Sequence, residues 1–122
     1  MEKKRILIVE DEIEAADYLK EYFKDRGFEV MTAATGEEGL NLLISQHPSL
    51  VLLDIRLGES LSGMEVLRRA KARNTQADII MLTAVEDRNV AELAQGLGAS
   101  SYLTKPFVLR EIEEIVLSHL KA

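Results

Sequence analysis

Residues 50–54 read Leu-Val-Leu-Leu-Asp, four apolar residues followed at once by a carboxylate. A run that is apolar at every position is typical of a strand buried on both faces of a parallel sheet, whereas a half-exposed strand alternates apolar and polar residues. Residues 6–9 (Ile-Leu-Ile-Val) and 79–82 (Ile-Ile-Met-Leu) have the same character. Two less uniform runs, at 30–33 and 102–103, bring the predicted strands to five.

Segments with helical periodicity alternate with these runs. In four of them the apolar residues recur every three or four positions: Ala15, Ala16, Leu19, Tyr22 and Phe23; Val66, Leu67 and Ala70; Val90, Leu93, Ala94 and Leu97; and Leu109, Ile112, Ile115, Val116 and Leu120. The second segment opens with a predicted capping box, Thr35 as N-cap and Glu38 three residues on. Gly27 is a natural end for the first segment, and Gly96 with Gly98 for the fourth. This alternation predicts an α/β fold of three layers, a doubly wound parallel sheet with helices on both faces.

Size and charge narrow the class of function. The 122 residues, 47% of them hydrophobic, suffice for one domain with a core, and we expect residues 1–122 to form a single domain. A net charge of −6 disfavours nucleic-acid binding by this domain alone. The absence of cysteine excludes disulfides, thiolate metal sites and cysteine nucleophiles. Because the apolar runs are too short for an export signal or a membrane span, we expect a cytoplasmic protein that does not bind membranes.

Polar residues of complementary chemistry follow the predicted strands. Glu10 and Asp11 come after the first, Asp54 after the third, Thr83 after the fourth and Lys105 after the fifth. The carboxyl ends of parallel strands share one edge of the sheet, so the three carboxylates, the hydroxyl and the ammonium are predicted to meet in one cleft. A divalent cation such as Mg²⁺ relieves the repulsion between the carboxylates and can bridge one of them to a phosphoryl oxygen. This set suffices for phosphoryl transfer, which needs mostly positioning and charge neutralisation.

Each of these residues, taken alone, also has an ordinary structural explanation. Glu10, Asp11 or Thr83 can cap the helix that follows, and Asp54 can belong to a turn. Lys105 before a proline can be a surface turn. Their joint occurrence at the same ends of successive strands favours a site.

The same residues carry a resemblance to the receiver domains of response regulators, the CheY-like proteins of two-component signalling. The resemblance covers the whole chain and rests on four stretches: Ile-Leu-Ile-Val-Glu-Asp-Glu at 6–12, Leu-Val-Leu-Leu-Asp-Ile-Arg-Leu at 50–57, Ile-Ile-Met-Leu-Thr-Ala at 79–84, and Gly-Ala-Ser-Ser-Tyr-Leu-Thr-Lys-Pro-Phe at 98–107. The resemblance implies the flavodoxin-like fold with strand order 2-1-3-4-5, an order for which the chemotaxis member of the family is a standard example. It also implies a cis peptide bond between Lys105 and Pro106.

By that resemblance the acidic residues form a metal and acceptor site. Glu10, Asp11, Asp54 and the backbone carbonyl of Arg56 are expected to hold Mg²⁺, or Mn²⁺ in its place. Asp54 is expected to accept the phosphoryl group from a phosphohistidine of a sensor histidine kinase or phosphotransfer protein. The chain is therefore expected to catalyse its own phosphorylation and dephosphorylation, and not to turn over an external substrate.

The remaining roles follow from the same resemblance. Lys105 and Thr83 are expected to hold the phosphoryl group, with Ala84 and Pro106 beside it. Tyr102 is expected to rotate inward as Thr83 moves, although a half-buried core aromatic is its simpler interpretation. This movement would remodel the face formed by the fourth helix, fifth strand and fifth helix, where a dimer is one expected outcome.

The output is left open by the sequence. The chain ends just after the predicted fifth helix, at Ala122. It fits a complete single-domain regulator that acts on a downstream protein, and equally the receiver part of a longer protein with an output domain. The loop at 57–63 departs from the family pattern, because Gly58 stands where the family often has proline and the loop is about one residue longer. We expect this to make the loop more flexible.

Three other functions are known in principle to suit the same fold, and each makes a different demand on the sequence. A Mg²⁺-dependent phosphatase with an Asp nucleophile would be expected to carry a second Asp two residues after Asp54, where Arg56 stands. A flavin or nucleotide binder would need a glycine-rich phosphate loop where the acidic residues 10–12 lie. A docking module that works without phosphorylation would not need the complete set of site residues.

Overall fold

The computed structural model describes residues 3–106 and 108–120, without the side chain of Val85. Its five strands are β1 (Arg5–Val9), β2 (Glu29–Ala33), β3 (Leu50–Asp54), β4 (Asp78–Thr83) and β5 (Ser101–Thr104). Its helices are α1 (Ile13–Asp25), α2 (Gly36–Gln46), α3 (Gly63–Ala72), α4 (Arg88–Gly96) and α5 (Leu109–His119), with a short 3₁₀ turn η1 (Val85–Asp87) before α4. The strands form one parallel sheet in the order β2-β1-β3-β4-β5, which confirms the predicted topology.

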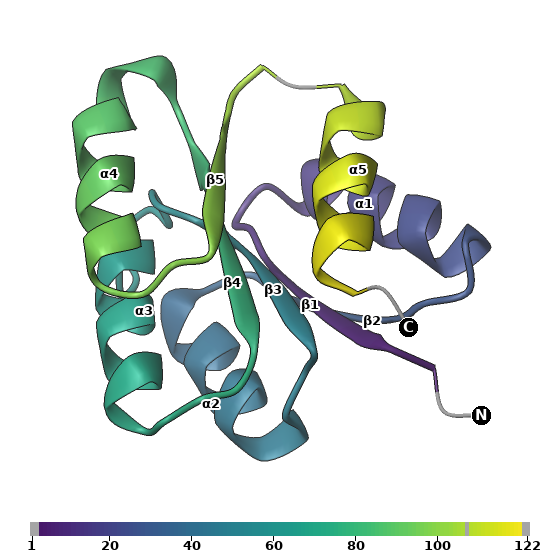
Figure 1. The fold of residues 1–122 in the computed structure, drawn as a ribbon, viewed down its shortest axis with the longest axis horizontal. Coiled ribbons are helices and arrows are strands. Elements are labelled where there is room, and N and C mark those ends of the chain that lie inside the picture. Colours follow the sequence, from purple (N-terminus) through teal and green to yellow (C-terminus); the bar gives the residue numbers. More distant parts are fainter. Residues whose placement is uncertain (1–2, 107, 121–122) are drawn as a thin grey trace.

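The sheet is the middle of three layers. Figure 1 shows it nearly edge-on, with α2, α3 and α4 on one side and α1 and α5 on the other. Along β1, Leu7 and Val9 pack in the core on the α2–α4 side, while Ile6 and Ile8 pack in the core on the α1–α5 side. Because successive side chains of a strand point to opposite faces, a strand in this position must be apolar throughout.

The central strands bear out that expectation. All residues at positions 6–9, 50–53 and 79–82 are fully buried. The edge strands β2 and β5 each have partly exposed residues, which explains their less uniform sequence.

The start of α2 differs slightly from the predicted capping box. Thr35 Oγ1 accepts a hydrogen bond from Glu38 N at 3.1 Å, as expected. The Glu38 carboxylate, however, accepts from the backbone N–H of Ala34 at 2.9 Å and not from that of Thr35. The helix start is still capped from both sides, because two backbone donors are satisfied.

The predicted inner face of α4 was wrong in part. Ala91 and Ala94 are fully buried, whereas Leu93 and Leu97 are 66% and 49% exposed. Small alanines at helical spacing let α4 lie close to the sheet, and the two leucines are thereby turned to solvent. Gly96 is the last residue of α4, and Gly98, with φ of +109°, forms the turn beyond it.

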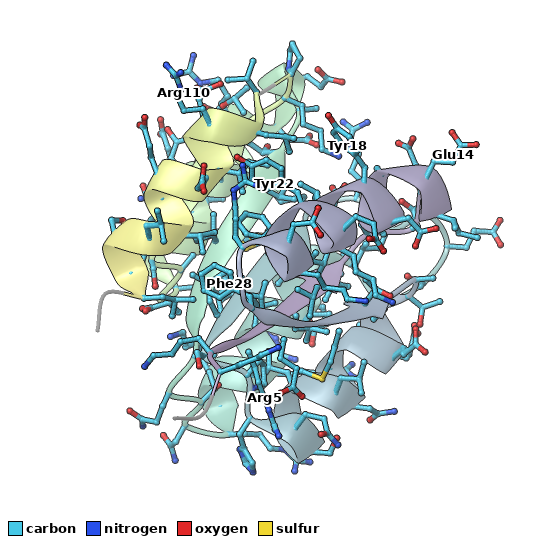
Figure 2. The ribbon with its side chains drawn as sticks, turned by 90° about the vertical axis from the view of Figure 1, so that its right-hand side faces the viewer. Arg5, Glu14, Tyr18, Tyr22, Phe28 and Arg110 are labelled. Carbon is cyan, nitrogen blue, oxygen red and sulfur yellow. The ribbon has the colours of Figure 1, made fainter. Side chains whose placement is uncertain are left out.

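A polar cluster joins α1 to α5. The Glu113 carboxylate accepts from Tyr22 Oη at 2.8 Å and from Arg26 Nε at 2.7 Å, and the Arg26 guanidinium lies 3.6 Å from the centre of the Tyr22 ring. Figure 2 shows Tyr22 between the two helices of this layer. Within the described residues, no helix has the length and apolar character needed to cross a membrane.

Candidate functional site

The carboxyl edge of the sheet gathers the polar residues that follow the strands. Asp54 and Thr83 are the last residues of β3 and β4, and Glu10 and Lys105 directly follow β1 and β5. Val9 pairs with Leu53 across the neighbouring strands β1 and β3, so that Glu10 emerges next to Asp54. The predicted convergence at one edge is confirmed for these four positions.

Asp54 is a buried carboxylate held by two donors. The residue is only 6% exposed. Oδ2 lies 2.6 Å from Lys105 Nζ, and Oδ1 accepts from the backbone N–H of Arg56 at 3.1 Å. Such a carboxylate is kept in one orientation at the sheet edge.

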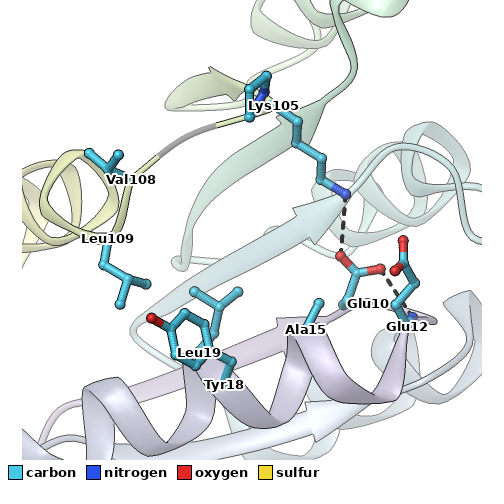
Figure 3. A pocket seen from close by; sticks show the side chains of 9 residues that line it. Glu10, Glu12, Ala15, Tyr18, Leu19, Lys105, Val108 and Leu109 are labelled. Atoms are coloured by element: carbon cyan, nitrogen blue, oxygen red, sulfur yellow. Dashed lines mark hydrogen bonds and ion pairs between the residues drawn. The ribbon is translucent and has the colours of Figure 1, made fainter.

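Glu10 lies beside it, 3% exposed. Its Oε1 is 3.3 Å from Lys105 Nζ, and its Oε2 accepts from Glu12 N at 3.2 Å; Figure 3 shows both interactions. Burial, and then the negative charge of Asp54, raises the pKa of Glu10 to about 7. Near neutral pH this carboxyl is therefore divided between its neutral and ionised forms.

Lys105 is the cation between these two acids. Burial works to lower its pKa, but the hydrogen bond to Asp54 and the charges of Asp54 and Glu10 outweigh burial, and the pKa of Lys105 is raised. Its backbone N–H donates to the carbonyl of Thr83 at 2.7 Å. This hydrogen bond fixes the backbone of Lys105, from which the side chain extends to Asp54. The peptide bond to Pro106 is cis, as the family resemblance implied.

Three carboxylates are close enough to share a metal ion. Oxygens of Glu10, Asp11 and Asp54 all lie within 4.8 Å of one another. Asp11 is exposed, so its carboxylate can turn toward solvent or toward a cation. Carboxylate oxygens are the ligands that Mg²⁺ prefers, and the residues present therefore fit this ion.

A cavity of about 270 Å³ opens at Asp54. Lys105, Asp11, Arg56 and Ala84 also line it, whereas Glu10, which was predicted to share the cleft, lines the adjoining cavity. Pro106 also lines that larger adjoining cavity. The carbonyl oxygen of Arg56 as a metal ligand stays a prediction.

Thr83 and Tyr102 lie behind the residues that line the cavity at Asp54. Thr83 is 1% exposed, and its hydroxyl donates to the carbonyl of Ala84 at 3.1 Å. Tyr102 is partly buried against the core on the α2–α4 side. Among the described residues, neither of them lines the cavity at Asp54 in this state.

The loop after Asp54 is tied to its neighbours. Ser60 Oγ donates to the carbonyl of Leu57 at 2.6 Å and accepts from Gly36 N at 3.1 Å. The backbone N–H of Leu61 donates to the Glu37 carboxylate at 3.2 Å. Gly58 has φ of +64°, a left-handed conformation that suits glycine. These contacts give the loop more support than its glycines led us to expect.

One functional-site residue escaped the sequence analysis. Asp87 accepts from Arg56 Nε at 2.6 Å and from Arg56 Nη2 at 2.9 Å, in a two-point ion pair at the rim of the cavity. This hydrogen bond raises the pKa of Arg56. Asp87 follows β4 by four residues, so an extension of the search for acids beyond each strand end would have included it.

Known proteins are similar to this chain in sequence and in fold. The family model described as "Response regulator receiver domain" matches residues 6–117. The uncharacterized transcriptional regulatory protein YkoG of Bacillus subtilis is 42% identical over 95% of this chain. Sporulation initiation phosphotransferase F of the same organism is 32% identical, and the match covers 98% of this chain and 96% of that protein. The crystal structure of a CheY-like receiver domain protein from Methanospirillum hungatei superposes with a TM-score of 0.89 at 32% identity, covering 96% of this chain and 93% of that one.

The extent of these matches differs between relatives. The chain spans about half the length of YkoG, 49%, whereas it corresponds to nearly all of the sporulation phosphotransferase. The family model and the superposed structure both cover almost the whole chain. The chain belongs to the receiver domains of response regulators, the phosphoacceptor modules of two-component signalling systems.

Proposed function

We propose that Asp54 is the phosphoacceptor of this receiver domain, which spans residues 1–122. The observation that carries the proposal is the fixed, buried carboxylate of Asp54, 2.6 Å from Lys105 Nζ at the mouth of a cavity. An aspartate oxygen attacks the phosphorus, and the bond from phosphorus to the donor's histidine nitrogen breaks. The donor is a sensor histidine kinase or a phosphotransfer protein.

Glu10, Asp11, Asp54 and the backbone carbonyl of Arg56 would hold the metal ion, Mg²⁺ or Mn²⁺. When bound, the ion supplies positive charge to an oxygen of the incoming group. The spacing of the three carboxylates, within 4.8 Å, supports this assignment. Titration with Mg²⁺ is expected to show weak binding that Asp11→Ala removes, and binding retained in that variant would place the metal elsewhere.

Lys105 neutralises a further phosphoryl oxygen, since its ammonium already lies against Asp54. The Thr83 hydroxyl, which now donates to the carbonyl of Ala84, turns and donates a hydrogen bond to the phosphoryl group instead. Ala84 and Pro106 flank the phosphoryl group. The chain thus catalyses its own phosphorylation and the hydrolysis that reverses it, and it is not a turnover enzyme for an external substrate.

The movement of Thr83 is passed to Tyr102, which packs on the same side of the sheet as Met81 of β4. Tyr102 packs on the α4 side of the sheet, so an inward rotation would alter the surface of α4, β5 and α5. Leu93 on α4 and Leu97, directly after this helix, are exposed and give this surface apolar contact area. A second copy, a downstream protein or an output domain of a longer chain would dock there, in the cytoplasm.

The protein donor would approach over the larger cavity, about 610 Å³, between the starts of α1 and α5. Figure 3 shows Tyr18 and Leu19 on α1 facing Leu109. Lys105 also lines this cavity, which therefore adjoins the acceptor. Tyr18→Ala is expected to slow transfer from a phosphorylated kinase and to leave labelling by a small donor unchanged.

Acetyl phosphate with Mg²⁺ tests the acceptor itself. Intact-mass measurement is expected to show one added phosphoryl group, absent in Asp54→Asn. The matched control is Asp17→Asn, an exposed aspartate on α1 that should label normally. Unchanged labelling of the Asp54 variant would place the acceptor on another residue.

A further inference from the structure

The guanidinium of Arg56 is engaged at the edge of the acceptor cavity, but not with the acceptor. Its Nε and Nη2 lie 2.6 Å and 2.9 Å from the two oxygens of Asp87. The side chain of Arg56 is 64% exposed, while that of Asp87 is 12% exposed. The arginine is thus the mobile partner of the pair, and the aspartate is the fixed one.

Arg56 also touches Asp54 through its main chain. Its N–H donates to Asp54 Oδ1 at 3.1 Å, and both residues line the cavity of about 270 Å³ together with Asp87. A long arginine side chain that starts next to the acceptor can swing from Asp87 to a group bound on Asp54.

We infer that Arg56 is a phosphoryl-binding residue that Asp87 holds in reserve. The inference rests on the proposal that Asp54 is the phosphoacceptor. A phosphoryl group offers three acceptor oxygens and about two negative charges, against one charge on Asp87. The planar fork of a guanidinium pairs with phosphate as well as with carboxylate, so the exchange needs no new geometry from the arginine.

The exchange has a consequence for the neighbouring segment. Asp87 is the last residue of η1 and directly precedes α4, and its backbone N–H donates to the carbonyl of Ala84 at 2.9 Å. Once Arg56 leaves, the little-exposed carboxylate of Asp87 loses its counter-ion and must reach water or another donor. Phosphorylation is thereby coupled to the start of α4 through Asp87 as well as through Thr83, whose hydroxyl donates to the same carbonyl of Ala84.

The test compares the affinity of Mg²⁺-loaded variants for beryllium fluoride, a stable stand-in for the phosphoryl group on aspartate, by ¹⁹F NMR titration. Arg56→Ala, which keeps the backbone carbonyl proposed for the metal, is expected to weaken binding several-fold. Asp87→Asn is expected to strengthen it, because the reserve partner is lost. The double variant should match Arg56→Ala, and Arg56→Lys should recover part of the loss.

Arg73→Ala, an exposed arginine at the end of α3, is the control and should bind as the parent protein does. A second measurement uses the parent protein alone and therefore does not depend on whether the variants fold. The NMR signal of the Arg56 Nε–H should shift when beryllium fluoride is added. Equal affinities in all Arg56 and Asp87 variants, weaker binding in Asp87→Asn, or an unmoved Nε–H signal would each overturn the inference while leaving Asp54 as acceptor. Binding that survives Asp54→Asn would instead overturn the proposed function.

Discussion

Nζ of Lys105 lies 2.6 Å from Oδ2 of Asp54. The same ammonium lies 3.3 Å from Oε1 of Glu10, so one cation serves two buried acids from different strands. Burial and the charge of Asp54 already raise the pKa of Glu10, and the charge of Lys105 acts in the opposite direction and limits that rise. Lys105 is thus the cation that is paired with both buried carboxylates at the carboxyl edge of the sheet.

Replacement of this lysine is expected to disable phosphorylation more than folding. Lys105→Ala removes a cation that would neutralise the phosphoryl oxygens during transfer, and the rate of labelling by acetyl phosphate should fall by about 100-fold or more. Intact-mass time courses measure the rate. Lys24→Ala, at the exposed end of α1, is the matched control. A Lys105→Ala rate within a factor of about three of the control would mean that another group neutralises the transferring oxygens.

Gly63 is expected to tolerate no side chain. A Cβ at Gly63 would lie 2.1 Å from the carbonyl oxygen of Asp54, because the first residue of α3 packs directly on the backbone of Asp54. Gly63→Ala should lower the free energy of unfolding by about 1–3 kcal/mol, as overpacking does. It should also slow phosphorylation, since Asp54 must shift.

Gly96→Ala supplies the comparison within the same protein. A Cβ at this position meets nothing within 4 Å, and the residue ends a helix, where alanine is favoured over glycine. Urea unfolding of both variants is the measurement. If Gly63→Ala were as stable and as quickly labelled as Gly96→Ala, the backbone at Asp54 would be able to shift with no loss of stability or of labelling rate.

The central strands could be predicted from sequence because burial on both faces leaves no room for polar residues. Once β1, β3 and β4 are parallel neighbours, the place of Glu10 and Asp54 follows from chain direction alone. The orientation of α4 could not be predicted in the same way. Alanines and leucines recur there at the same period, and only packing against the sheet decides that Ala94 lies inside and Leu93 outside.

The pairing of Arg56 with Asp87 lies beyond sequence patterns. The two residues are 31 positions apart and lie on loops that follow different strands. Whether they meet depends on the turn η1 and on side-chain directions, neither of which has a periodicity to read. The support of the loop at Ser60 was missed for the same reason, since its partner Gly36 lies on another element.

The link between α1 and α5 is expected to depend on Glu113. Glu113→Ala removes the acceptor of both Tyr22 and Arg26, and the melting temperature should fall by a few degrees. The hydrogen bond to Glu113 raises the pKa of Tyr22, so that pKa should fall back toward its ordinary value in the variant. Alkaline titration of tyrosine absorbance follows it. Glu114→Ala, an exposed neighbour on the same helix, should change neither quantity.

Glu10 is expected to make the metal-free protein less stable as the pH rises. Its pKa is about 7 in the folded protein against an ordinary value of 4.5, so folding favours the neutral acid. The associated stability is complete below pH 4.5 and is lost as the pH rises through 7, a change on the order of 1–3 kcal/mol. Urea unfolding in a chelator between pH 5 and 8 should show this fall in the parent protein and in Glu12→Gln. Glu10→Gln should flatten it, and an unchanged slope there would assign the titration to another group.

Addition of Mg²⁺ should reverse that loss at high pH more than at low pH. The cation and the proton compete for the same cluster of carboxylates, Glu10, Asp11 and Asp54. At pH 8 Glu10 is ionised and free of its proton, so that cation binding adds to the free energy of unfolding by mass action. At pH 5 the proton must first be displaced, and the same Mg²⁺ concentration should stabilise less. An equal stabilisation at both pH values would mean that the cation does not compete with the proton on Glu10. The cation would then be bound by Asp11 and Asp54 without Glu10.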